Sequence, residues 1–107
     1  MDGEITASAL ADLLDADASV EIVDIRRPPA FERGHIPGSR NLPLGRLVDR
    51  IDELDSDADR IVTVCPHGES SVQAARLIDS YEGIEETPVV SLADGLEGWD
   101  GPVENGE

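Results

Sequence analysis

Residues 61 to 78 read IVTVCPHGESSVQAARLI, and this stretch decides the fold. Its first four residues are apolar or β-branched, which is typical of a buried strand. The proline and the glycine that follow prevent both a longer strand and an immediate helix. From residue 72 to residue 78, apolar side chains recur at helical spacing. The stretch therefore predicts a strand, a tight loop and a helix, with Cys65 at the end of the strand and Ser70 or Ser71 as the helix N-cap.

This order places Cys65 where backbone N–H groups gather. A loop of successive amides that leads into a helix N-terminus binds anions, and the helix dipole adds to the effect. A thiol in such a place tends to ionise, and the thiolate is the nucleophilic form. Pro66 has no N–H, so the donors must follow it: His67, Gly68, Glu69, Ser70 and Ser71. A buried structural cysteine is the simpler alternative, but the loop and the helix start favour a reactive thiol.

The segment VCPHGESSVQAARLI resembles the active-site loop of rhodanese-like domains, the sulfurtransferase family. The family pattern is Cys, two variable residues, Gly, one variable residue, Arg and Ser, followed by an Ala-rich helix. Cys65, Gly68 and Ser71 match this pattern by position. Ser70 stands where the family usually carries an arginine.

Two further segments resemble signatures of the same family, in the family's order. Residues 22 to 43, IVDIRRPPAFERGHIPGSRNLP, resemble its VDVR and GHIPG signature. Residues 95 to 99, GLEGW, resemble its C-terminal signature, with Asp94 in place of the first glycine. The resemblance implies a three-layer α/β/α fold with a central, mainly parallel sheet of about five strands. We expect a single domain over residues 1–103 and a frayed polar tail over residues 104–107.

The sequence pattern by itself points to an α/β protein. Val20–Ile25 and Val89–Leu92 are further strand candidates, and strands that alternate with helices predict a parallel sheet covered on both faces. Thr6 is placed to cap a first helix, and Pro28 to begin a short second one. A regular helix is expected over residues 44–54, with its apolar face formed by Leu44, Leu47, Val48, Ile51 and Leu54. Arg46 and Arg50 on its other face do not by themselves predict an anion site.

Asp24 follows the first long strand, and Cys65 follows the central one. Because ligands bind beyond the carboxyl ends of parallel strands, we expect both residues on the same rim of the sheet. The family's D-x-R pair falls on Asp24 and Arg26. We favour a salt bridge that supports the rim over direct contact with substrate.

The two histidines have different predicted roles. His35 lies in the GHIPG segment, and we expect it to form structural hydrogen bonds. His67 lies inside the cysteine loop, where it either moves a proton or orients an acceptor, or simply faces solvent. The sequence does not decide between a functional role and simple exposure to solvent for His67.

The chain has 107 residues and a formal net charge of −16, from 24 acidic and 8 basic residues. Its apolar strands argue for a folded domain with an acidic surface, as in proteins from the high-salt cytoplasm of a halophilic archaeon. Such a charge disfavours nucleic acid and anionic membranes as partners. One cysteine and no apolar run of membrane-spanning length suggest a cytoplasmic protein. We expect a monomer.

The resemblance and the loop together predict a sulfurtransferase. In this hypothesis Cys65 takes a sulfane sulfur from a small donor, holds it as a persulfide, and passes it to a thiol, cyanide or a sulfur-carrier protein. The chemistry needs no cofactor and no metal. Because Ser70 replaces the usual arginine, we expect thiosulfate to be a poor donor.

Three alternatives come from other classes of protein. A phosphatase or arsenate reductase needs an arginine six residues after the cysteine, and Ser71 occupies that position, so we reject it. A non-catalytic rhodanese-homology module that binds a partner or senses sulfur stays open, although the retained Cys65 argues against it. A metal site is disfavoured, since Cys65, His67 and His35 are too few soft ligands.

Overall fold

The computed structural model describes residues 3–16, 19–54, 58–66, 70–80, 87–93, 95–99, 101 and 103–104. Five parallel strands form one sheet: β1 (Glu4–Ile5), β2 (Val20–Asp24), β3 (Arg40–Asn41), β4 (Arg60–Val64) and β5 (Val89–Leu92). Their spatial order is β1-β5-β4-β2-β3, so β4 is the central strand. The expectation of a mainly parallel sheet of about five strands is confirmed.

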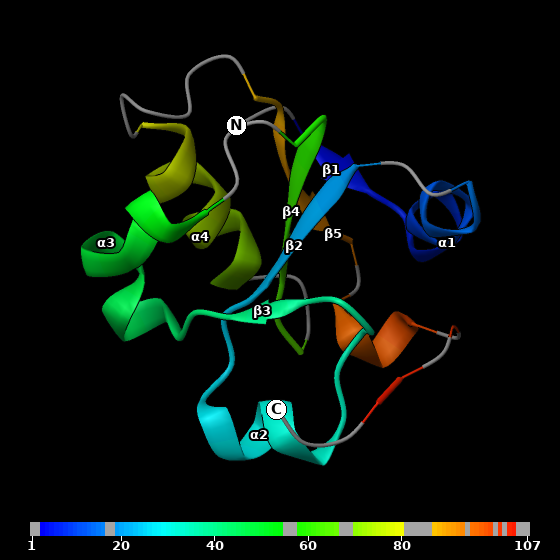
Figure 1. Ribbon diagram of the computed structural model, residues 1–107, viewed down its shortest axis with the longest axis horizontal. Coiled ribbons are helices and arrows are strands. Elements are labelled where there is room, and N and C mark those ends of the chain that lie inside the picture. Colours follow the sequence, from blue (N-terminus) through cyan, green and yellow to red (C-terminus); the bar gives the residue numbers. More distant parts are fainter. Residues whose placement is uncertain are drawn as a thin grey trace.

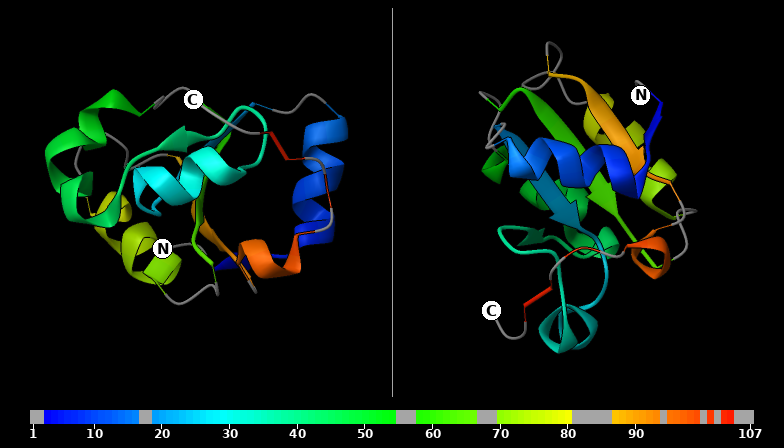
Figure 2. Two further views of the ribbon diagram at one scale, coloured as in Figure 1. Left: turned by 90° about the horizontal axis from the view of Figure 1, so that it is seen from below. Right: turned by 90° about the vertical axis from the view of Figure 1, so that its right-hand side faces the viewer.

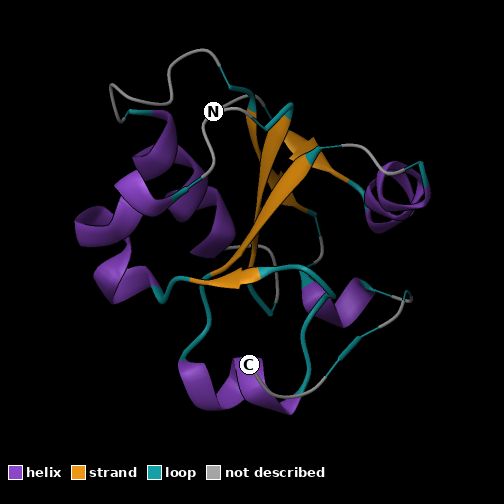
Figure 3. Ribbon diagram, in the orientation of Figure 1, coloured by secondary structure: helices purple, strands orange, loops and turns teal. Residues whose placement is uncertain are grey.

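Helices cover both faces of the sheet, which gives the three layers expected from the sequence (Figures 1 and 2). On one side lies α1 (Ala7–Asp15), and on the other lie α3 (Leu47–Arg50) and α4 (Ser70–Asp79). The short helix α2 (Pro28–Arg33) lies below the carboxyl-terminal edge of the sheet in Figure 3. Among the described residues, no helix has both the length and the apolar character needed to cross a bilayer.

Successive residues of the inner strands point to opposite faces, so each face has its own apolar core. On β4, Ile61 packs on the α4 side, whereas Val62 and Val64 pack on the α1 side. On β5, Val89 and Val90 divide in the same way. Because both faces are covered, the inner strands are apolar runs without polar alternation, which is why they stand out in the sequence.

The segment after β3 departs from the regular helix predicted for residues 44–54. It forms a 3-10 turn (Leu44–Arg46), the short α3, and a second 3-10 turn (Ile51–Glu53). Leu47, Ile51 and Leu54 are buried as predicted, but Val48 is 64 % exposed. A 3-10 turn has about three residues per turn, so the buried residues follow a different spacing and Val48 points away from the sheet.

The C-terminal end is more ordered than the predicted frayed tail. Glu104 pairs with His35 as an isolated antiparallel bridge, with two backbone hydrogen bonds of 2.9 and 2.8 Å. The prediction of a tail that begins at residue 104 is therefore wrong for Glu104. Residues 105–107 lie outside the described part of the chain.

Candidate active site

Cys65 directly follows the last residue of β4 and is 2 % exposed. Its side chain joins the core on the α4 side of the sheet, beneath the first turn of that helix. The backbone N–H of Ser71 points at the cysteine sulfur, with 3.3 Å between nitrogen and Sγ. A hydrogen bond from a helix N-terminus stabilises negative charge on that sulfur.

The helix begins at Ser70, so Ser70 and Ser71 are helical residues and neither is the residue before the helix. Both are candidate N-caps in the sequence analysis, but the structure places them inside the first turn of the helix. The residues just before the helix, His67, Gly68 and Glu69, lie outside the described residues. Their predicted amide contacts to substrate stay a prediction.

Buried hydroxyl groups hold the first turn of α4 on the sheet. Thr63 of β4 donates a hydrogen bond from Oγ1 to the carbonyl oxygen of Ser71 at 2.7 Å. The hydroxyls of Ser71 and Ser91 of β5 lie 2.6 Å apart. All three residues are fully buried, where unpaired polar groups would be costly. These bonds fix the height and rotation of the helix start, and therefore the direction of the Ser71 N–H.

The GLEGW segment supports the cysteine from the other side of the loop. The Leu96 amide donates to the Cys65 carbonyl at 2.8 Å, and the Glu97 amide donates to the Pro66 carbonyl at 3.2 Å. Gly95, at φ 61°, leaves no room for a side chain, since a Cβ there would overlap both of these carbonyl groups. Trp99 is buried in the α1-side core. The third family signature thus holds the backbone of Cys65 and Pro66.

A cavity of about 520 Å³ opens beside Cys65, within the size range of small-molecule sites. Four apolar residues line it: Ile25, Pro29, Ala30 and Leu44. Three arginines also line it, together with Pro66 and Ser70: Arg26, Arg27 and Arg33. Sequence reasoning missed Arg27 and Arg33, because their position depends on how α2 folds back over the carboxyl edge of the sheet.

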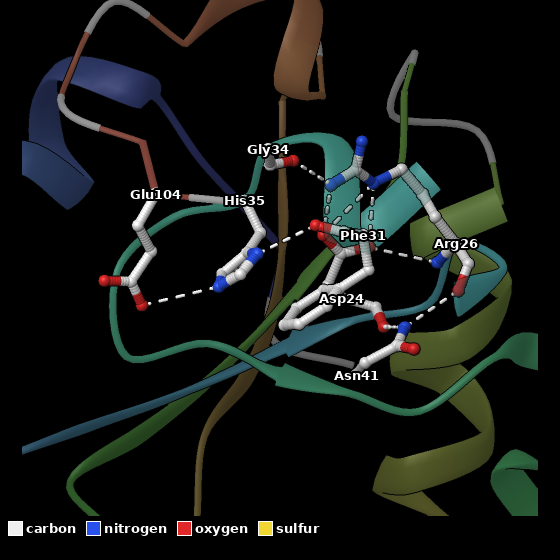
Figure 4. Close-up of polar contacts among 7 residues, drawn as sticks. All are labelled: Asp24, Arg26, Phe31, Gly34, His35, Asn41 and Glu104. Carbon is white, nitrogen blue, oxygen red and sulfur yellow. Dashed lines mark hydrogen bonds and ion pairs between the residues drawn. The ribbon is translucent and has the colours of Figure 1, made fainter. Parts of the chain in front are cut away.

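The buried Asp24 and the half-buried Arg26 form a multiply bonded ion pair at the rim (Figure 4). Arg26 donates from Nε and Nη2 to the Asp24 carboxylate at 2.8 to 3.1 Å, and from Nη2 to the Gly34 carbonyl at 2.6 Å. Asn41 donates to the backbone oxygens of Asp24 and Arg26. Asp24 pairs in register with Val64, the neighbour of Cys65, so the two residues share one rim as predicted. The Asp24 side chain does not line the cavity, which supports the rim-stabilising role.

His35 stacks on the Phe31 ring, with 3.7 Å between ring centroids (Figure 4). Its Nδ1 lies 2.8 Å from the Phe31 carbonyl oxygen, and its Nε2 lies 3.4 Å from a carboxylate oxygen of Glu104. The ring is buried and does not line the cavity beside Cys65. Its contacts connect α2 to the C-terminal segment, as the structural role predicted for His35 requires.

These features define a class of α/β protein in which a cysteine at the end of a central parallel strand lies against a helix N-terminus. The chain belongs to the rhodanese-like domain family, whose model matches residues 6–101. The GlpE protein of Stutzerimonas stutzeri, a thiosulfate sulfurtransferase, is 46 % identical over 83 residues, which are 78 % of this chain and 72 % of GlpE.

Two further relatives agree with this assignment. The YrkF protein of Bacillus subtilis, a putative sulfur carrier protein, is 34 % identical over 101 residues, and this chain spans 52 % of its length. The crystal structure of a rhodanese-like domain protein from Staphylococcus aureus superposes with a TM-score of 0.84 over all of both chains, at 22 % identity, and shares the fold. The chain is thus a homologue of sulfurtransferases and sulfur carriers, with a single, buried cysteine.

Proposed function

We propose that this protein is a sulfurtransferase in which Cys65 carries the sulfur as a persulfide. The Cys65 thiolate attacks the outer sulfur of thiosulfate, the S–S bond of the donor breaks, and sulfite leaves with the electron pair. The product is Cys65–S–S⁻. An acceptor thiolate or cyanide then attacks the outer sulfur of the persulfide, the bond to Sγ breaks, and the Cys65 thiolate is regenerated.

The observation that carries the proposal is the Ser71 N–H directed at Sγ from the first turn of α4, at 3.3 Å. This donor stabilises the attacking thiolate and the thiolate that leaves in the second step. The cavity gives a small donor access to the buried sulfur from the side of α2. The relatives named for sulfur transfer and sulfur carriage support the same chemistry.

Thiosulfate is the donor that we propose, although Ser70 alone predicts that it binds poorly. Arg27 and Arg33 line the same cavity as Cys65, so positive charge reaches the donor site from α2 instead of the cysteine loop. A 46 % identical relative is a thiosulfate sulfurtransferase. Both observations argue against the prediction that thiosulfate is a poor donor. Variants of Ser70 and Arg33 test that prediction directly.

The test of the function is Cys65→Ser. This variant keeps the side-chain size and the hydrogen bond from Ser71 but has no nucleophilic sulfur. We expect a folded protein with no transfer from thiosulfate to cyanide or to thiols. Turnover at the parent rate would show that Cys65 is not the nucleophile.

A sulfur carrier is the second candidate, because YrkF is a putative sulfur carrier protein. A carrier also needs the Cys65 persulfide, but it passes the sulfur on without repeated turnover of a small donor. Steady-state release of sulfite with excess thiosulfate and thiol favours the enzyme, and release of one equivalent favours the carrier.

The proposal also includes the state and location of the protein: a monomer in a reducing cytoplasm, without nucleic acid or membrane partners.

A further inference from the structure

A second cleft adjoins the Cys65 cavity, and its lining is unusual for so acidic a chain. It has a volume of about 730 Å³ and is lined by Arg27, Arg46 and Arg50, together with Pro28, Asn41, Pro43 and Gly45. Arg27 lines both hollows, and Leu44 of the first lies between Pro43 and Gly45 of the second. Arg27 therefore borders both the second cleft and the cavity beside Cys65.

The described side chains that line these two hollows carry a charge opposite to the net charge of the chain. Carboxylates outnumber arginines 24 to 8 in the sequence, yet no Asp or Glu is among the described residues that line either hollow. The described lining includes five of the eight arginines: Arg26, Arg27, Arg33, Arg46 and Arg50. An anion repelled by most of the surface would be attracted here.

Three of these five arginines, Arg27, Arg33 and Arg46, form no side-chain ion pair within the described residues. Arg26 is bound to Asp24, and Arg50 donates to both carboxylate oxygens of Glu53. The charges of Arg50 and Glu53 partly compensate because the two groups form an ion pair, and the hydrogen bond from Arg50 holds the pKa of Glu53 below its usual value. None of the side-chain ion pairs within the described residues involves Arg27 or Arg46. Both are exposed at the cleft.

We propose that this cleft recognises the sulfur acceptor, and that the acceptor is a low-molecular-weight thiol carrying carboxylates. The proposal rests on the sulfurtransferase function above. The thiol would enter the Cys65 cavity, while its carboxylates lie against Arg27 and Arg46 and are held by charge-assisted hydrogen bonds. The size of the cleft suits a small molecule.

In this step the acceptor thiolate attacks the outer sulfur of Cys65–S–S⁻ and forms a new S–S bond. The bond between Sγ and the outer sulfur breaks, its electron pair stays on Cys65, and the acceptor leaves as a persulfide. No oxidant or reductant is consumed. The arginines change how often an anionic acceptor is bound in position, and they take no part in bond breaking.

The experiment compares two acceptors on protein that already carries the persulfide, so donor binding does not enter. Mercaptosuccinate, a thiol with two carboxylates, is compared with neutral 2-mercaptoethanol by the second-order rate of sulfur removal. The ratio of the two rates within one protein cancels the reactivity of its persulfide, and comparison of this ratio between variant and parent cancels the intrinsic reactivity of each thiol. We expect Arg46→Gln to lower this ratio about fivefold, the scale of one exposed charge contact, and the decrease to shrink in molar salt.

Arg60→Gln is the matched control, because Arg60 begins β4 at the end of the strand away from Cys65 and lines neither hollow. It removes the same charge, and we expect it to leave the ratio unchanged. An unchanged ratio in Arg46→Gln, or an equal decrease in Arg60→Gln, would overturn the proposed acceptor site. If no persulfide forms at all, it is the proposed function that fails.

Discussion

Ser70 and Arg33 face the same cavity beside Cys65, and they lead to opposite expectations for an anionic donor. A serine supplies a hydrogen bond but no charge, so Ser70 leaves the anion site of the loop incomplete. In our proposal Arg33, the last residue of α2, supplies positive charge at this cavity. We expect the balance between them to decide which sulfur donor the protein uses.

We expect Arg33→Gln to raise the KM for thiosulfate about fivefold with little change in kcat, because binding of the dianion is what is lost. Steady-state kinetics at fixed salt measure this, with Arg60→Gln as the charge control. Ser70→Arg should then change kcat/KM only slightly. Ser70→Arg could instead improve kcat/KM about tenfold or more, the scale of a charge-assisted hydrogen bond. In that case the cysteine loop lacks the charge that binds thiosulfate, and the prediction that thiosulfate is a poor donor holds.

Gly95 is the second residue whose replacement gives a sharp expectation. Its positive φ and its contact with the carbonyls of Cys65 and Pro66 exclude any side chain. Gly95→Ala should shift the Cys65 loop and reduce the rate of persulfide formation about a hundredfold, as expected for displacement of a reacting group by about 1 Å. It should also lower the melting temperature.

The melting temperature has its own control. At Gly45 an added Cβ meets no atom within 4 Å, so Gly45→Ala should not lower the melting temperature. A Gly95→Ala protein with the parent rate of persulfide formation would show that the GLEGW turn does not hold the loop in place.

At the scale of elements, α4 is positioned by hydroxyl groups of two strands. Thr63→Val keeps the shape of the side chain but leaves the buried Ser71 carbonyl without its 2.7 Å partner. The free energy of unfolding should fall by about 1–3 kcal/mol. Persulfide formation should slow as well, because the Ser71 N–H belongs to the same turn.

Ser80→Ala provides the comparison at the other end of α4. Ser80 donates a similar bond to Leu77 at 2.8 Å, but at an exposed site, where water replaces a lost partner. Denaturant unfolding should show almost no change for this variant. An equal loss in both variants would mean that burial of the Thr63 bond is not important.

The elements most easily predicted are those with the strongest local signal. The β-branched runs of β4 and β5, the Thr6 cap of α1 with its 3.0 Å bond to the Ala9 amide, and the Pro28 start of α2 were all predicted from neighbouring residues. The irregular segment Leu44–Glu53 was not, because its apolar spacing fits a regular helix equally well. Packing against α4 and the sheet decides between the two.

The features of the site were likewise predictable only where the residues involved are close in sequence. Cys65, the rim position of Asp24 and the structural role of His35 follow from motifs whose residues are close in sequence. The support from Ser91, the Gly95 contact and the two arginine-lined hollows join segments far apart in the chain. The net charge of −16 could not reveal the two hollows, because it does not show that five of the eight arginines gather there.

For the whole molecule, the acidic composition predicts a dependence of stability on salt. Repulsion among the carboxylates opposes the compact state, and it weakens as the Debye length falls from about 30 Å in dilute buffer to about 3 Å in molar salt. We expect the melting temperature to rise with KCl, with most of the rise below about 1 M, where screening is nearly complete. A melting temperature that is flat or falls over this range would contradict a salt-adapted surface.

The central claim is that Cys65 holds a transferable sulfur, and intact mass spectrometry tests it most directly. The protein is incubated with thiosulfate, freed of excess donor, and measured before and after addition of a thiol. We predict a gain of one sulfur atom, located at Cys65, absent in Cys65→Ser, and lost again when the thiol is added. If a protein shown to be folded gains no sulfur from thiosulfate or from any other sulfane donor, the account of this site is contradicted.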